Sequence, residues 1–217
     1  MPTTGRDGRS SKSETGSLKA PGRKPKADDG GAKQRLIEAT AQIMHDEGYA
    51  AATSRRVAAK AGVKQALVYY YFPTMDDLFV EVLRAGGEVA LEQLRGVLLD
   101  DDPLRALWRI NSDPRQTVLS TEFMALANHR KAVGAELKTY SERVRDIETA
   151  AVTLALRASG TDLDDYPPVV ISMIVAQIAR SVGNEGAVGV THGHEELRTF
   201  IDRQIDLLTK PSEAVRG

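Results

Sequence analysis

The chain has 217 residues, 41% of them hydrophobic, which excludes a fully disordered protein and allows a sizeable core in one or two domains. It contains no cysteine, which excludes disulfides and cysteine-based zinc or iron–sulfur sites. No apolar run approaches the roughly 18–20 residues that span a bilayer, and the first thirty residues lack the apolar middle of a signal peptide. We therefore expect a cytoplasmic protein without a membrane partner.

Positive charge is concentrated at the start of the chain. Residues 1–26 contain seven basic and two acidic side chains, so the rest of the chain carries a net charge of −6. Glycine, serine, threonine, proline and lysine dominate residues 1–30, and such a segment buries too little apolar surface to offset its ordering entropy. We therefore expect residues 1–30 to be a disordered basic tail on a near-neutral body.

The tail contains a motif that resembles the AT-hook, an extended arm that lies in the minor groove of DNA. It reads Pro21-Gly22-Arg23-Lys24-Pro25-Lys26, and Lys24 separates Arg23 from Pro25, whereas the AT-hook core is Gly-Arg-Pro. The negative potential of a narrow A·T groove attracts arginine. Arg23 and Lys24 are therefore candidate DNA contacts, and a solvated tail that aids solubility is the alternative.

Three short helices are predicted next in the chain. A helical pattern begins at Lys33, repeats at intervals of three and four residues, and ends at Gly48. Thr53 can cap a second helix that ends at Gly62. A third helix is predicted at residues 64–72, before a proline that disfavours helix in the residue preceding it.

The second and third helices have the features of a helix-turn-helix. The small side chain of Ala61 permits the two helices to approach closely, and Gly62 can adopt the left-handed conformation that reverses the chain. Val68 and Phe72 are expected to pack inward. The opposite face of the third helix is then free to enter a major groove of DNA, with cationic, phenolic, amide and apolar groups suited to phosphates and bases. That face consists of Lys64, Gln65, Ala66, Leu67, Tyr69 and Tyr70.

The rest of the chain also has helical patterns, and no strand pattern or repeat is present. Thr74 and Asp77 resemble a capping box for a fourth helix that runs to about Leu99, and Gly86-Gly87 should weaken or bend this helix. The predicted fold is therefore all-α, with about nine helices. The five remaining helices are expected at residues 103–110, 114–128, 131–158, 167–182 and 195–208.

The motif residues resemble the TetR family of transcriptional regulators in order and spacing over about residues 33–80. They are Gly48-Tyr49, Thr53, Val57-Ala58, Ala61-Gly62-Val63, Tyr69-Tyr70-Tyr71-Phe72 and Asp77-Leu78. The resemblance implies a helix-turn-helix domain at residues 31–78, a helical effector-binding and dimerisation domain at 79–210, and a flexible C-terminus at 211–217.

The resemblance also implies roles for individual residues. Thr53, Lys64, Tyr69 and Tyr70 would contact phosphates, and Gln65, Ala66 and Leu67 would face bases. Arg55 is a further candidate, although Arg55, Arg56 and Lys60 could instead be a solvated face, and the tyrosines could be core aromatics. The chain departs from the family at Lys64, at Ala66-Leu67 and at Met75, where most members have a lysine that contacts the DNA backbone.

Residues 169–182 are apolar nearly all round, so two sides of that helix must be covered. The resemblance implies that the helices at about 167–184 and 195–208 form a four-helix bundle with a second copy across a two-fold axis. A ligand cavity is also expected from the resemblance, and ordinary core packing is the alternative for its lining. The candidate lining residues are Trp108, Phe123, Met124, Leu126, Asn128, His129, Leu137, Tyr140 and Met173.

The sequence also bears on two other classes of function. No phosphate-binding glycine loop or nucleophile elbow is present, and His192-x-His194 lies in a glycine-rich segment without a matching carboxylate cluster, so we expect no enzyme, cofactor or metal site. An architectural DNA-binding protein that acts through its basic tail is the alternative. The sequence favours a homodimeric repressor that a small, hydrophobic effector releases from a palindromic operator on double-stranded DNA.

Overall fold

A computed structural model describes residues 29–209, apart from the side chains of residues 29, 30, 115 and 116. This part of the chain contains nine α-helices, two short 3-10 helices and no strand, which confirms the predicted all-α fold. Every predicted helix is present. The α-helices are α1 (Asp29–Glu47), α2 (Ser54–Lys60), α3 (Gln65–Tyr71), α4 (Met75–Arg95), α5 (Pro103–Asn111), α6 (Pro114–Ala127), α7 (Lys131–Ser159), α8 (Pro168–Ala187) and α9 (His194–Thr209).

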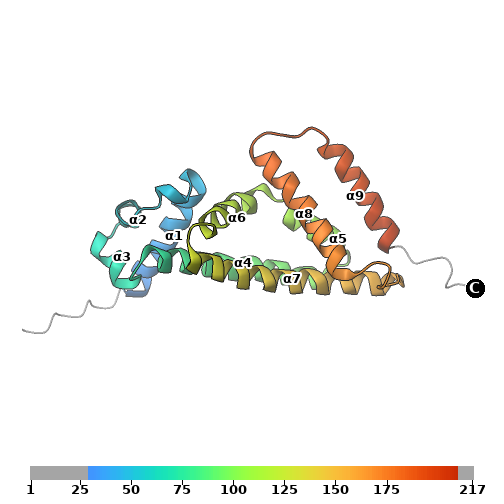
Figure 1. The fold of residues 1–217 in the computed structure, drawn as a ribbon, viewed down its shortest axis with the longest axis horizontal. Coiled ribbons are helices and arrows are strands. Elements are labelled where there is room, and N and C mark those ends of the chain that lie inside the picture. The colour runs from blue at the N-terminus through green and yellow to red at the C-terminus, as the bar shows by residue number, and fades with distance from the viewer. Residues whose placement is uncertain (1–28, 210–217) are drawn as a thin grey trace, which may run out of the picture.

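Two long helices form the base of the molecule. Helices α4 and α7 lie side by side, with α1 to α3 at one end and α5, α6 and α8 packed over them (Figure 1). Thr74 and Asp77 form the predicted capping box at the start of α4. The α-helix ends at Arg95 and continues as a 3-10 turn over Gly96–Leu99, close to the predicted end.

Helix α4 runs without interruption through Gly86 and Gly87. Gly86 faces open space, whereas a Cβ atom on Gly87 would lie 3.0 Å from the Tyr140 ring of α7. Gly87 therefore permits the close approach of the two long helices. The pair was expected to weaken or bend α4; the helix is continuous here, and close packing is the role visible for Gly87 alone.

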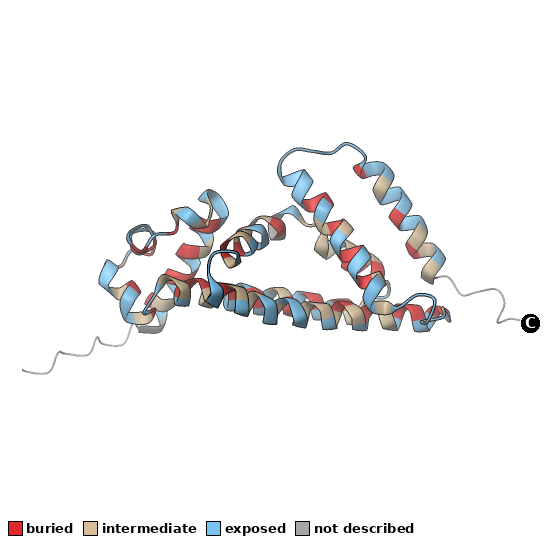
Figure 2. Cartoon of the chain, viewed as in Figure 1, coloured by how far each residue is buried: buried red, intermediate tan, exposed pale blue. Residues whose placement is uncertain are grey.

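Two hydrophobic clusters hold the helices together, and both lie on the inward faces shown in Figure 2. The first joins α1 to α4 with Phe123 and Leu126 of α6 and Val133 of α7. The second joins the ends of α4 and α7 with α5, α8 and α9. Because the first cluster includes α6 and α7, the hydrophobic core continues across the domain boundary predicted at residue 78.

Candidate nucleic-acid interface

The turn between α2 and α3 is built as the sequence predicts. The Thr53 side chain accepts a hydrogen bond from the backbone N–H of Arg56 and so caps α2. Ala61 is buried, and Gly62 has a φ of +66°, in the left-handed region that favours glycine. The Val63 N–H donates to the Ala58 carbonyl at 3.0 Å, which closes the turn.

Helix α3 divides its side chains between the core and solvent. Val68 and the adjoining Phe72 are buried in the first hydrophobic cluster. Tyr69 is 50% exposed and Tyr70 is 60% exposed, whereas Tyr71 is partly buried against the same cluster. The two tyrosines assigned to DNA therefore face outward, as expected, and the Tyr70 ring meets the Tyr71 ring edge to face at 5.0 Å.

The other predicted contact residues in the described part of the chain are also accessible. Leu67 is half-buried, and the rest are exposed: Thr53, Arg55, Lys64, Gln65 and Ala66. Arg56 forms an ion pair with Glu47 of α1. Arg23 and Lys24, the candidates in the tail, lie outside the described residues.

Ser54, a buried residue of α2 that is not among the predicted contacts, forms hydrogen bonds with two of them. Its hydroxyl oxygen accepts hydrogen bonds from Gln65 Nε2 at 2.8 Å and from the Tyr69 hydroxyl at 3.1 Å. Ser54 thus orients one predicted base-reading side chain and one predicted phosphate-binding side chain. The sequence offers no signal for this role, because a serine after an N-cap threonine is common at any helix start.

Comparison with known proteins places this geometry in a family. Residues 36–82 match the family model described as "Bacterial regulatory proteins, tetR family". These residues form a TetR-family DNA-binding domain.

The curated relatives are similar to part of the chain. HTH-type transcriptional regulator BetI 1 of Chromohalobacter salexigens is 32% identical over 108 residues, which cover 45% of this chain and 54% of the relative. BetI of Rhizobium meliloti is 29% identical over 119 residues and covers 54% of each chain. The chain thus spans about half the length of the curated relatives it matches.

Solved structures share the fold over most of the chain. A TetR transcription regulator from Haloarcula marismortui has a TM-score of 0.68 at 20% identity, and covers 83% of this chain and 100% of its own. A protein from Saccharomonospora viridis, described as a transcriptional regulator and solved in complex with choline, has a TM-score of 0.69 at 14% identity. That likeness covers 82% of this chain and 96% of the other.

Met75 occupies the position at which most TetR-family members were expected to have a backbone-binding lysine. Here Met75 is partly buried and packs against the first hydrophobic cluster. It therefore contributes to the core, and this TetR-type domain has no cation at that position.

The nine candidate pocket residues are not brought together in one cavity. Phe123 and Leu126 are buried in the first cluster, with Leu137 packed against it, and Trp108 packs against the second. Tyr140 lines a small cavity of about 20 Å³ between α4 and α7. The remaining candidates are exposed: Met124, Asn128, His129 and Met173.

The described part of the chain shows no sign of a metal site or a membrane span. His194 is buried and its Nε2 lies 2.8 Å from Glu185 Oε2, whereas His192 is exposed. No group of three or more potential metal ligands occurs among residues 29–209. None of the helices in this range is long and apolar enough to cross a membrane.

Proposed function

We propose that this protein is a sequence-specific transcriptional regulator, and that it represses from a palindromic operator until a small ligand releases it. The observation that carries the proposal is the α3 surface. Buried Val68 and Phe72 fix the helix to the core, and Lys64, Gln65 and Tyr70 project to solvent beside the Gly62 turn. Such a helix fits a major groove, with phosphate and base contacts on one face.

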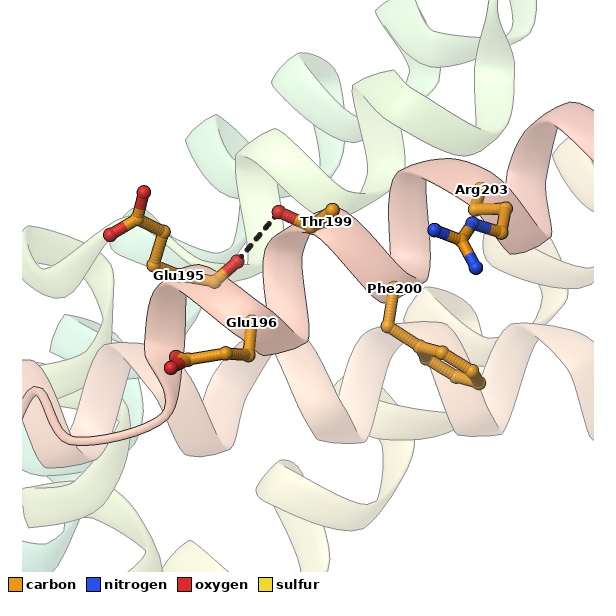
Figure 3. Close-up of a pocket in the computed structure, with 5 residues that line it drawn as sticks. All are labelled: Glu195, Glu196, Thr199, Phe200 and Arg203. Carbon is orange, nitrogen blue, oxygen red and sulfur yellow. Dashed lines mark hydrogen bonds between the residues drawn. The ribbon is translucent and has the colours of Figure 1, made fainter.

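Dimerisation is supported by unpartnered apolar side chains on α8 and α9. Val169, Val170, Met173 and Ile174 form an exposed stripe on α8, because they recur at intervals of three and four residues. Phe200 and Leu207 are exposed on α9. Phe200 also lines an open hollow of about 530 Å³, with the charged groups of Glu195, Glu196 and Arg203 around it (Figure 3). A second copy related by two-fold symmetry would cover these faces.

The contacts of helix α6 link α8 to the DNA-binding domain, and a ligand could act on that domain through them. At one side, Glu122 accepts a hydrogen bond from the Tyr49 N–H, and Phe123 enters the first hydrophobic cluster. At the other, Thr117 packs so closely on α8 that a Cβ on Gly183 would lie 2.8 Å from its hydroxyl oxygen. A ligand that shifts α6 would therefore change contacts to α8 and to the residues that precede α2.

Selection of bound duplexes from a random DNA pool tests the DNA-binding part of the proposal. We expect a palindromic sequence to be enriched and to bind two chains, with half-sites about 34–36 Å apart or a multiple of that spacing. Sedimentation of the free protein at micromolar concentration should show a dimer. Equal affinity for all duplexes would favour the architectural alternative, and a monomer would contradict the interface.

A further inference from the structure

A group of charged and polar side chains lies between α5, α7 and α8, away from the DNA-binding face. Its members are Arg145 and Glu148 of α7, Arg180 of α8 and Asn111 at the end of α5, and we call them the Glu148 cluster. The Glu148 side chain is 1% exposed, although glutamate is seldom fully buried. The two arginine side chains are 29% and 30% exposed, although the Nη1 atom of Arg145 is itself buried.

The hydrogen bonding inside the Glu148 cluster is incomplete. Arg180 Nη1 donates to Asn111 Oδ1 at 2.7 Å and lies 3.4 Å from Glu148 Oε1. Arg145 Nη1 and Glu148 Oε2 lie 3.4 Å apart, and both are buried without a hydrogen bond among the described residues. A buried ion pair repays its desolvation only with close geometry and satisfied polar atoms. One donor of the Glu148 cluster, Arg145 Nη1, is therefore left without a hydrogen bond by the cluster's own residues.

The charge of the Glu148 cluster favours an anion. Two guanidinium groups face one carboxylate, which leaves a surplus of one positive charge when Glu148 is ionised and of two when it is protonated. Burial raises the pKa of Glu148, against the opposing effect of Arg180 and Arg145. A quaternary ammonium such as choline would add another positive charge here. An organic carboxylate would neutralise the surplus, and the planar fork of arginine matches a carboxylate.

The surroundings of the Glu148 cluster are apolar. Val144 and Val152 lie one turn on either side of Glu148 along α7, and both belong to or pack against the second hydrophobic cluster. Ile110, next to Asn111, packs there as well. Tyr140 lies on the same face of α7, one further turn away, and is half-buried. The charged groups of the Glu148 cluster are therefore bordered by apolar side chains of the core, the kind of side chain that lines most ligand sites.

We propose that the Glu148 cluster is a ligand subsite that binds the carboxylate of an organic acid with an apolar body, through Arg145 and Arg180. The inference rests on the proposed function, because it assigns a chemical class to the effector of the regulator. The ligand proposed here is an anion, whereas the structural neighbour from Saccharomonospora viridis is solved with choline, a cation.

Calorimetric titration of the full-length protein tests the ligand class. The probes are decanoate and 4-phenylbutyrate as carboxylates, decan-1-ol as an uncharged match for decanoate, and choline. We expect saturable binding of at least one carboxylate at one site per chain, weaker binding of decan-1-ol, and no binding of choline. Binding of choline alone, or of no carboxylate, would overturn the inference.

Substitutions locate the site. Arg145→Met should weaken carboxylate binding about tenfold to a hundredfold, because it removes a charge-assisted hydrogen bond. Arg143→Met is the matched control, since Arg143 is exposed on the same helix and pairs with Glu88 of α4, and it should leave binding unchanged. Equal affinities in the parent and the Arg145 variant would place the ligand elsewhere and refute the assignment.

Glu148→Gln is a second test, because it should affect the binding of a carboxylate and the binding of a cation in opposite directions. Glutamine keeps the shape of Glu148 and removes the carboxylate that competes for the arginines, so carboxylate binding should hold or tighten. If Glu148 bound a cation, the same change would abolish binding. Thermal unfolding by circular dichroism checks that each variant folds. If Arg145→Met does not fold, binding to the Glu148→Gln variant decides between a carboxylate and a cation.

Operator binding is measured separately by fluorescence anisotropy with and without the carboxylate. If the protein binds its operator but no carboxylate, the subsite is refuted and the DNA-binding function stands. If the carboxylate binds through Arg145 without changing operator affinity, the subsite stands and the ligand-release model falls.

Discussion

Glu122 Oε2 of α6 accepts a hydrogen bond of 2.7 Å from the backbone N–H of Tyr49, the residue that begins the short turn between α1 and α2. The two residues are 73 positions apart in the chain. This bond connects the helix-turn-helix to α6, and α6 in turn packs on α8.

Glu122→Ala should lower the free energy of unfolding by about 1–3 kcal/mol, because it leaves a partly buried N–H without its acceptor. It should also reduce the effect of a bound ligand on operator affinity, since it removes a contact between α6 and the DNA-binding domain. Urea unfolding and anisotropy titrations measure the two effects. Glu142→Ala, an exposed change on α7, should shift stability by no more than about 0.5 kcal/mol.

Ser54→Ala should weaken operator binding and broaden the base preference at the position read by Gln65. The hydroxyl that orients Gln65 and Tyr69 is lost, whereas Thr53 still caps α2, so the fold should remain stable. Binding to a set of operator variants measures the preference. Tyr69→Phe removes only the second hydrogen bond and should leave the base preference intact; a broadened preference in both variants would assign that role to Tyr69.

Lys64→Ala and Tyr70→Ala should both weaken operator binding without unfolding the protein, because both side chains are exposed. Lys64→Ala should also flatten the dependence of log affinity on log salt concentration by about one unit, since one fewer counterion is released. Gln65→Ala and Leu67→Ala should change the preferred base instead. Lys138→Ala on α7, which pairs with Glu142, is the control, and a similar loss of slope there would argue against a specific Lys64 contact.

Gly86 and Gly87 should respond differently to alanine. Gly86→Ala meets open space and should stabilise α4 by about 0.5–1 kcal/mol. Gly87→Ala should stabilise less or destabilise, because its Cβ would press on the Tyr140 ring, and Tyr140→Ala should remove that difference. A double-mutant cycle by urea unfolding measures the coupling. Operator titrations of the two single variants with and without ligand then test whether α4 also transmits the ligand signal. If the ligand changes operator affinity equally in both variants and in the parent, the two glycines have no part in that transmission.

Glu148→Gln should raise the melting temperature near neutral pH and give no gain at low pH. Burial raises the pKa of Glu148 in the folded protein, so its ionised form is disfavoured on folding. That cost is complete above the folded pKa, shrinks as pH falls through it, and vanishes below the unfolded pKa, where both states bind the proton. Calorimetric melts across this range test the sign, and a gain that persists in acid would contradict it.

The order of the helices and the division of α3 follow from local signals that the sequence carries. Thr53 and the Thr74 capping box begin helices through side-chain hydrogen bonds to nearby backbone N–H groups, and Gly62 reverses the chain through its left-handed backbone. The spacing of Val68 and Phe72 selects the buried face. These features were predicted and are present. They depend on residues that are neighbours in the chain.

Contacts between distant helices could not be predicted in this way. A periodic pattern shows which face of a helix is buried, but it does not show which helix covers that face. No sequence pattern therefore indicates that Glu148 of α7 meets Arg180 of α8, or that Gly87 packs against Tyr140. The candidate pocket residues were dispersed for the same reason, since apolar character alone does not separate a cavity wall from a packed core.

The first hydrophobic cluster has a consequence for engineering. Fusing the helix-turn-helix of this chain to the helical domain of another protein would require a cut between the two parts. In this chain a cut after residue 78 would strip Phe123, Leu126 and Val133 from the core that supports α1 to α3, and would expose apolar surface on both fragments. A working hybrid would have to carry the matching faces of α6 and α7 along with the helix-turn-helix, so the smallest transplantable unit is defined by shared packing and not by the sequence motif.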